Sequence, residues 1–339
     1  MRFLQDIHLP RFIEHLSDHG VLHGPIRTDD GVLAFRPLRS PGEIQHHYSR
    51  TLLPPKKYLL PPREKILEWS EAAGYMHVLE EHPPIVLYGL HPCDVAGIAY
   101  LDKMFLHSDQ CYEEKRKALI LVSVSCEPDQ FCFCGATGSC STACGDIHLE
   151  AGEGGFYIHP AGEIGDVLLA SSSSFLEDRE PPRHEERSFP GEAPIKEAVA
   201  CGEKFNQSPL WDEFADRCLS CGACSLCCPT CYCFDIKEHG DLDGSSAPRL
   251  REWDNCLFRS HGEIAGGTNF RLSRRERFRY RYQHKYLGFG PSRGLLSCVG
   301  CGRCREVCPV EIDLLRLFEE WKGGQTEGIF RRRMLNDRE

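Results

Sequence analysis

The alternation of apolar and polar residues in the first half of the chain predicts two buried strands with a helix between them. Residues 85–90 (IVLYGL) and 118–125 (ALILVSVS) are short apolar runs with the length and β-branched content of buried strands. Between them, residues 94–105 carry apolar side chains at helical spacing. Strand, helix and strand in this order favour a parallel sheet, so we expect residues 1–170 to form an α/β domain.

The pattern changes at residues 171–194, which hold four consecutive serines, several prolines and runs of charge. We interpret this stretch as a linker or an exposed excursion. Beyond it, helical patterns cover three stretches: residues 195–206, 210–217 and 312–322. The expected fold class is therefore α+β multidomain, with a C-terminal α-helical domain over residues 195–325 and a polar tail over 326–339.

Composition narrows the class of protein. The chain has 339 residues, of which 41% are hydrophobic and 27% charged, enough apolar residues for a packed core. No apolar run approaches the ~18 residues that a membrane-spanning helix needs. The N-terminal residues are mixed in charge and lack the features of an export signal. We therefore expect a cytoplasmic protein whose 20 cysteines are reduced and serve as ligands rather than in disulfides.

Twelve of the cysteines crowd into residues 218–308, where one motif occurs twice. The copies are Cys218-x2-Cys221-x2-Cys224-x3-Cys228-Pro229 and Cys298-x2-Cys301-x2-Cys304-x3-Cys308-Pro309. Three thiolates at this spacing wrap one [4Fe–4S] cube, and the fourth, before proline, binds the cube of the other motif. The spacing predicts cluster 1 on Cys218, Cys221, Cys224 and Cys308, and cluster 2 on Cys298, Cys301, Cys304 and Cys228. Zinc is the alternative, but a zinc site has no use for the third cysteine and the Cys-Pro of each copy.

The two copies are separated by residues 230–297, much more than the short link of a compact two-cluster ferredoxin. This insert also contains helical patterns. We therefore expect the ferredoxin-type dicluster domain to be built from helices.

A second group of cysteines follows the two predicted strands. Cys93 comes just after the first strand, and Cys126, Cys132 and Cys134 come after the second. In a parallel sheet the carboxyl ends of neighbouring strands share one edge, where ligands bind. A third [4Fe–4S] cluster on these four cysteines is therefore expected, and a set of unmetallated thiols is the alternative.

The remaining cysteines have no assigned role. Packing as small hydrophobic residues is the interpretation for six of them: Cys111, Cys201, Cys227, Cys231, Cys233 and Cys256. Another metal site is the alternative for Cys231, Cys233 and Cys256. Cys140 and Cys144 are candidates to replace one ligand of the third site.

Residues 259–293 are basic, with nine Lys or Arg against two Glu, a net charge of +7 that leaves −17 for the rest of the chain. Arg274, Arg277, Arg281 and Lys285 fall at helical steps, beside a stripe of aromatic residues. Two interpretations stay open: a solvated helix face, or cations that offset the charge of the clusters and tune their potential. Nucleic-acid binding is not expected, because the chain as a whole is acidic.

Motifs for other chemistry are missing from the sequence. There is no Gly-x-Gly-x-x-Gly fingerprint and no Gly-x4-Gly-Lys-Ser/Thr phosphate loop. No set of Ser, His and Asp suggests a nucleophile with its base, so no residue is assigned a catalytic role. The chain is expected to pass single electrons rather than to accept a hydride.

Longer motifs extend this pattern along the chain. They read Gly89-Leu-His-Pro-Cys-Asp94, Cys126-x5-Cys132-Phe-Cys134-Gly135, Cys218-Leu-Ser-Cys-Gly-Ala-Cys224, Cys228-Pro-Thr-Cys-Tyr-Cys-Phe-Asp235, Trp253-Asp-Asn-Cys256, Gly266-Gly-Thr-Asn-Phe-Arg271, His284-Lys285 and Cys298-Val-Gly-Cys301. Over roughly residues 40–320 the chain resembles the family of the sulfhydrogenase β subunits and of the iron–sulfur subunits of anaerobic sulfite reductase. The resemblance supports the third cluster by matching its four cysteines. Cys140, Cys144, Cys227 and the insert 171–194 depart from the family pattern.

The resemblance implies an iron–sulfur electron-transfer subunit of a heteromeric oxidoreductase complex, not catalytic alone. It would lie between a catalytic subunit of the sulfite-reductase, hydrogenase or related reductase type and a flavin- and nicotinamide-binding subunit. Two alternatives stay open at this point. One is a reductase subunit with its own cluster-based sulfur or disulfide chemistry, and the other is a stand-alone soluble ferredoxin.

Overall fold

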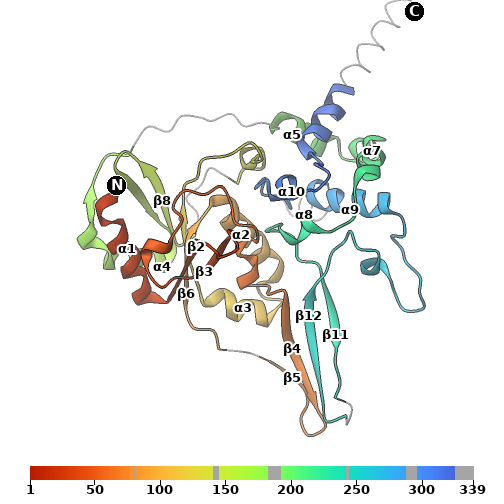
Figure 1. Cartoon of the computed structure of the whole chain (residues 1–339), viewed down its shortest axis with the longest axis horizontal. Helices are drawn as coiled ribbons and strands as arrows, with labels where there is room; N and C mark the ends of the chain where they lie inside the picture. Colours follow the sequence, from red (N-terminus) through yellow and green to blue (C-terminus); the bar gives the residue numbers. More distant parts are fainter. Residues whose placement is uncertain (79–80, 140–144, 182–191, 242–243, 288–295, 325–339) are drawn as a thin grey trace, which may run out of the picture. The chain divides into compact units, whose positions relative to one another are not determined.

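The structure, a computed structural model, describes residues 1–78, 81–139, 145–181, 192–241, 244–287 and 296–324 (Figure 1). The chain divides into two compact units. The first unit comprises Met1–Gln130, Ser139–Arg187 and Cys228–Trp253. The second unit comprises Phe131–Gly138, Ser188–Cys227 and Asp254–Glu339.

An eight-stranded sheet forms the centre of the first unit. Its strands lie in the order β10 (Leu176–Asp178), β1 (Arg2–Gln5), β9 (Gly155–Pro160), β8 (Ile147–Gly152), β7 (Leu119–Val124), β6 (Ile85–Leu90), β2 (Val21–Arg27) and β3 (Leu33–Pro37). The central strands β2, β6, β7 and β8 are parallel, and the flanking strands pair antiparallel. The two strands predicted from the apolar runs are β6 and β7, and their parallel pairing confirms the expected α/β arrangement.

Helices cover both faces of this sheet. They are α1 (Leu9–Leu16), α2 (Pro92–Phe105), α3 (Gln110–Lys117) and α4 (Gly162–Ser171). Phe12 of α1 and Leu168 of α4 share one buried core with Val122 of β7. Leu87 and Leu121 alternate with the residues of that core, so they are buried on the opposite face. The predicted helix over residues 94–105 is α2, which begins with a proline in its first turn and contacts β7.

A four-stranded antiparallel sheet completes the first unit. Its order is β11 (Phe234–Glu238), β12 (Ser246–Trp253), β4 (Arg63–Ser70) and β5 (Gly74–His77). The expectation that residues 195–325 are purely helical is therefore wrong, because β11 and β12 lie within them. β12 pairs with β4, with Leu250 opposite Lys65, and no local pattern reveals a partner so distant in sequence.

The predicted linker over residues 171–194 also contains regular structure. β10 is the edge strand of the large sheet, with Leu176 opposite Leu4 of β1. Leu176 packs against the buried core there, which explains why this short stretch is extended. Three residues are too few to show a period in the sequence. Residues 182–191 and the tail 326–339 lie outside the described residues.

Short helices make up most of the second unit. They are α5 (Glu192–Cys201), α6 (Glu203–Asn206), α7 (Leu210–Arg217), α8 (Ala223–Leu226), α9 (Arg274–Tyr286) and α10 (Arg303–Glu306), and residues 314–324 are also helical. The helix predicted over residues 195–206 is interrupted at Gly202, which has a positive φ of 43°. Aromatic side chains fill the core, where Trp211 stacks on Tyr282 and Phe205 stacks on Phe318. No helix in the described ranges is long and apolar enough to cross a membrane.

Four charged side chains of low exposure join α3 to β4 and β12 in the first unit. Glu64 on β4 accepts hydrogen bonds from Lys115 of α3 and, at 2.6 Å, from Nη2 of Arg251 on β12. Arg251 also pairs with Asp109, the N-cap residue of α3. The network fixes one end of the four-stranded sheet to a helix of the larger sheet.

Replacing Glu64 by glutamine is expected to lower the free energy of unfolding by about 3–5 kcal/mol, because it removes the counter-charge of buried Lys115 and one of the two carboxylates that pair with buried Arg251. Urea unfolding under anaerobic conditions, followed by circular dichroism, measures the change. The control is Glu68→Gln on the same strand, whose partner Lys65 is exposed, with an expected cost below about 1 kcal/mol. Equal losses in the two variants would contradict a stabilising role for the network.

Candidate metal centre

The two cysteine motifs adopt the same local fold. In each copy, two residues after the first cysteine have positive φ: Ser220 (53°) and Gly222 (80°) in the first, and Gly300 (60°) and Gly302 (78°) in the second. Such left-handed residues turn the chain tightly between the cysteines. Each loop then enters a single helical turn, α8 or α10. The repeated spacing in the sequence is therefore matched by a repeated backbone conformation.

Backbone N–H groups point at the sulfur atoms of both motifs. The three donor–acceptor pairs are Ser220 N to Cys218 Sγ at 3.3 Å, Gly300 N to Cys298 Sγ at 3.4 Å, and Ile312 N to Cys308 Sγ at 3.3 Å. The hydroxyl of Tyr286 also donates to Cys298 Sγ, at 3.4 Å. Hydrogen bonds to a thiolate stabilise its negative charge, and in iron–sulfur proteins they shift the potential of the cluster.

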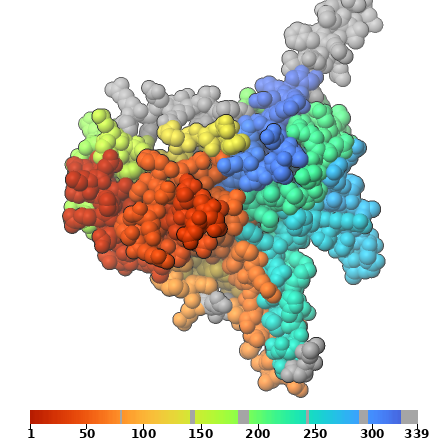
Figure 2. Space-filling model, in the orientation of Figure 1, coloured from red at the N-terminus to blue at the C-terminus, as the bar shows by residue number. Residues whose placement is uncertain are grey.

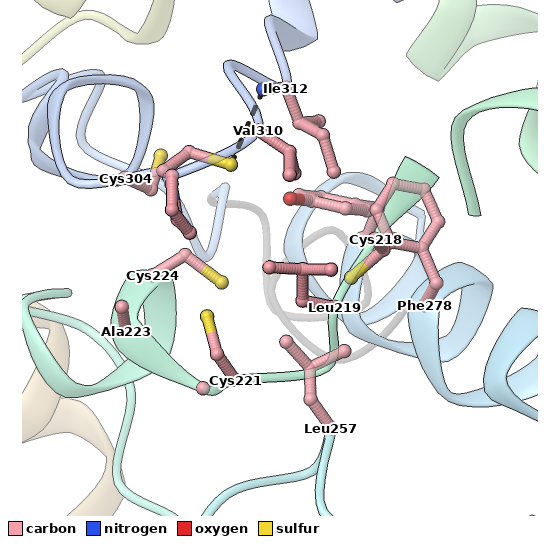
Figure 3. A pocket seen from close by; sticks show the side chains of 14 residues that line it. Cys218, Leu219, Cys221, Ala223, Cys224, Leu257, Phe278, Cys304, Val310 and Ile312 are labelled. Carbon is pink, nitrogen blue, oxygen red and sulfur yellow. Dashed lines mark hydrogen bonds between the residues drawn. The ribbon is translucent and has the colours of Figure 1, made fainter. Parts of the chain in front are cut away.

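A pocket lies between the two motifs (Figure 3). Its cysteines are Cys218, Cys221, Cys224, Cys304 and Cys308. In Figure 3 the sulfur atoms of Cys218, Cys221 and Cys224 are turned toward the same space. The structure thus brings together all four residues predicted for cluster 1, together with one predicted for cluster 2.

The chemistry of this pocket suits an iron–sulfur cube. Its remaining walls are mainly apolar and include Leu257 and Phe278. Burial raises the pKa of the Cys218 thiol, and the N–H of Ser220 opposes this effect. An ionised sulfur therefore needs a positive partner here, which iron would provide when bound. Four thiolates around an apolar space are the donor set of a [4Fe–4S] cluster.

Three of the four residues predicted for cluster 2 lie in the second unit. Burial raises the pKa of the Cys304 thiol well above its usual range, and the charges of Cys227 and Cys298 raise it further. Cys301 also contributes, so these sulfur-bearing residues lie close to one another. Cys228, the fourth predicted ligand, is the first residue of the segment that belongs to the first unit.

The residues predicted for the third cluster are divided between the two units. Cys93 and Cys126 belong to the first unit, where they follow the carboxyl ends of the neighbouring parallel strands β6 and β7. Cys132 and Cys134 belong to the segment Phe131–Gly138 of the second unit. The edge of the sheet thus carries two of the four thiols, as the strand order predicted.

The segment Phe131–Gly138 packs against the loop of the second motif. Phe133 N donates to the carbonyl of Gly300 at 2.8 Å, and Nη1 of Arg305 donates to the carbonyl of Phe131 at 2.7 Å. A Cβ on Gly300 would lie 2.5 Å from Phe133 O and 2.6 Å from Cys134 N. Cys134 therefore lies beside the cysteines of the second motif, a proximity that the sequence did not reveal.

The basic helix α9 is not a solvated face, because three of its predicted cations are buried: Arg277, Arg281 and Lys285. Arg281 contacts the first motif, donating to Cys224 O at 2.8 Å and to Ser225 Oγ at 2.7 Å. Its charge also lowers the pKa of the Cys304 thiol, against the larger effect of burial. This geometry favours the interpretation in which a cation acts on the clusters.

Asn255 is a site residue that the sequence reasoning missed. It is buried, and its side-chain amide donates to the carbonyl of Gly222 at 2.7 Å. A Cβ on Gly222 would lie only 2.4 Å from Asn255 Nδ2, so this position has no room for a side chain. The sequence feature that could have indicated Asn255 is the short motif from Trp253 to Cys256, whose residues do not have the spacing of metal ligands.

The other cysteines show three kinds of environment. Cys111, Cys227 and Cys256 are buried, which agrees with packing. Cys201 was also expected to be buried, but it is exposed at the end of α5 because the helix turns only its other faces inward. Cys231 and Cys233 are half-buried, and Cys140 and Cys144 lie outside the described residues.

Comparison with known proteins defines the class of this chain. A family described as "4Fe-4S dicluster domain" matches residues 217–312, which include both cysteine motifs. The chain is thus an iron–sulfur electron-transfer subunit whose dicluster domain carries two [4Fe–4S] clusters. No solved structure matches it significantly.

Relatives define the family. Sulfhydrogenase 2 subunit beta of Pyrococcus furiosus is 33% identical over 336 residues, which span 95% of this chain and 98% of that protein. F420-dependent formate dehydrogenase subunit beta of Methanocaldococcus jannaschii is 23% identical over 119 residues, 34% of this chain and 23% of that protein. The chain belongs to the sulfhydrogenase β-subunit family.

Proposed function

We propose that this chain relays single electrons in the cytoplasm between a catalytic subunit of the sulfite-reductase, hydrogenase or related reductase type and a flavin- and nicotinamide-binding subunit. The observation that carries this proposal is the pocket where Cys218, Cys221, Cys224 and Cys308 meet. The relatives support it, since both are named as beta subunits of oxidoreductases. When bound, a [4Fe–4S] cluster accepts and releases one electron.

The proposed ligand sets follow the motifs. Cluster 1 is assigned to Cys218, Cys221, Cys224 and Cys308, and cluster 2 to Cys298, Cys301, Cys304 and Cys228. Cys304 lines the same pocket as the cluster 1 residues, which supports a short distance between the sites of cluster 1 and cluster 2. Backbone N–H groups hold the sulfur atoms, and the apolar walls of the pocket limit access of water.

The third cluster is assigned to Cys93, Cys126, Cys132 and Cys134. Two observations support it. Cys93 and Cys126 follow neighbouring parallel strands, and the segment with Cys132 and Cys134 lies against Gly300 of the second motif. Metal analysis after anaerobic purification tests the assignment: about 12 iron atoms per chain are expected for three cubes, and about 8 would contradict the third. Zinc in place of iron would contradict all three.

Purification from cells tests the proposed partners. A chain that serves as a relay co-elutes with a flavoprotein and with a reductase or hydrogenase subunit under anaerobic conditions. A chain that elutes alone, and reduces a sulfur or disulfide substrate without partners, would contradict the relay.

Replacing Cys224 by alanine is expected to remove cluster 1 and about four iron atoms per chain, because the cube loses one of its four protein ligands. Iron and acid-labile sulfide analysis measure the loss. The control is Cys227→Ala, a buried cysteine three residues away that belongs to neither ligand set. If both variants keep, or both lose, the same amount of iron, the ligand assignment is wrong.

A further inference from the structure

Exposed apolar side chains gather on residues 259–273 and on the outer face of α9, in the second unit. The exposed fractions are 53% for Ile264, 61% for Phe270, 58% for Leu272 and 40% for Tyr280. The light-blue residues of this part of the chain form a portion of the surface seen in Figure 2. Large apolar side chains exposed as a group mark an interaction site rather than an ordinary protein surface.

Arg271 links two of these side chains, Phe270 and Tyr280. Its guanidinium carbon lies 4.8 Å from the ring centre of Phe270 and 4.1 Å from that of Tyr280. The arginine is thus stacked between two aromatic rings that are ten residues apart in sequence. Arginine and aromatic residues together are enriched in protein–protein interfaces.

This surface adjoins the pocket proposed for cluster 1. Buried Arg277 donates to the carbonyls of Arg271 and Leu272 at 3.1 and 2.6 Å, and to the carbonyl of Leu257 at 2.8 Å. Leu257 lines the pocket. Two residues that line the pocket, Cys221 and Leu219, are exposed, so the proposed site of cluster 1 lies near the protein surface.

The charge of the surface selects its partner. Residues 259–293 carry a net charge of +7, and three of their nine cations, Arg277, Arg281 and Lys285, are buried and do not belong to this surface. The exposed cations of this segment are Arg259, Arg274, Arg275 and Arg279. Arg259 pairs with Glu263, and Arg275 pairs with Asp212 and Asp216. Exposed cations around an apolar centre attract a partner with the opposite pattern, an apolar contact ringed by carboxylates.

We propose that the docking surface, made of Ile264, Phe270, Arg271, Leu272 and Tyr280, binds an acidic electron-carrier protein that exchanges electrons with this chain. The proposal rests on the proposed function and adds to it the place and the charge of the partner. One electron passes between carrier and chain, and no bond forms or breaks.

Stopped-flow mixing tests the docking surface. The oxidised holoprotein is mixed with a reduced, acidic plant-type ferredoxin, and bleaching of its absorbance gives the second-order rate constant. We expect this constant to fall about tenfold between ~0.05 and ~0.5 M NaCl, because screening weakens the attraction. Phe270→Ser is expected to lower it about tenfold at each salt concentration, and Arg271→Gln to lower both the rate and its salt dependence.

The matched control is Val167→Ser, which removes an exposed apolar side chain from α4 of the first unit and is expected to leave the rate unchanged. Reduced methyl viologen, which needs no docking surface, is expected to reduce all four proteins equally. Failure of methyl viologen to reduce the wild type contradicts the proposed function. If methyl viologen reduces the wild type but ferredoxin reduces neither Phe270→Ser nor Val167→Ser, or reduces both at the same rate, the docking surface is overturned. The proposed function is not affected by that result.

The same variants test two other possible occupants of the docking surface. Binding of a single-stranded RNA 20-mer that Arg271→Gln abolishes would assign the surface to nucleic acid. A dimer seen by analytical ultracentrifugation and lost in Phe270→Ser would assign it to a second copy of the chain. Either result overturns the proposal of a carrier protein.

Discussion

Both [4Fe–4S] clusters of the dicluster domain are expected to become harder to reduce when Arg281 is replaced by glutamine. The guanidinium is buried, donates to Cys224 O and Ser225 Oγ of the first motif, and acts electrostatically on Cys304 of the second. Reduction adds a negative charge, which a fixed neighbouring cation stabilises. Losing the cation is expected to lower the reduced-to-oxidised ratio about tenfold at a given potential, or about 59 mV for a one-electron couple.

Redox titration followed by electron paramagnetic resonance measures the two midpoint potentials. The control is Arg279→Gln, which removes a cation from the exposed face of the same helix, where solvent screens it. Arg281→Lys keeps the charge and is therefore expected to keep both midpoint potentials close to those of the wild type. A purely structural role would require the planar, forked guanidinium of arginine, which lysine lacks. Unchanged potentials in an Arg281→Gln protein with full iron content would show that this charge does not act on the clusters.

Replacing Gly300 by alanine is expected to abolish cluster 2 and to release the segment Phe131–Gly138 from the second motif. The added Cβ would lie 2.5 Å from Phe133 O and 2.6 Å from Cys134 N, which are backbone atoms that cannot rotate away. The φ of 60° adds about 1–2 kcal/mol for a residue with a Cβ. Iron content is expected to fall by at least about four atoms per chain, with lower thermal stability.

Gly154→Ala separates the effect of the close contact from the effect of the positive φ. Gly154 also has a positive φ, 76°, but no atom lies within 4 Å of the position of its Cβ. This variant bears only the backbone cost and is expected to keep its full iron content. If Gly300→Ala also binds full iron, the close packing of Phe131–Gly138 on the second motif does not support the cluster.

Local patterns in the sequence were sufficient for several elements. The two apolar runs became β6 and β7, and the helical spacing between them became α2. The spacing of the cysteine motifs also identified the residues that meet in the pocket, since a left-handed turn and one helical turn repeat in each copy. In all of these, the residues that decide the conformation are neighbours in the chain.

Long-range pairing explains the main errors. β11 and β12 were expected to be part of a helical domain, yet β12 pairs with β4, with Arg251 opposite Glu64, and β11 pairs with β12. β10 was included in a linker because three residues carry no readable period. Strand formation in both cases depends on an edge supplied by a distant segment.

The composition, the thiol count and the spacing of two motifs were enough to indicate a dicluster iron–sulfur protein, because ligand spacing along a short loop decides which thiolates can share one cube. Only the tertiary structure showed that Arg281 is buried beside Cys224, that Asn255 holds Gly222, and that Cys134 lies against Gly300. These contacts join segments far apart in the chain. They depend on how helices and loops pack, which no short window of sequence encodes.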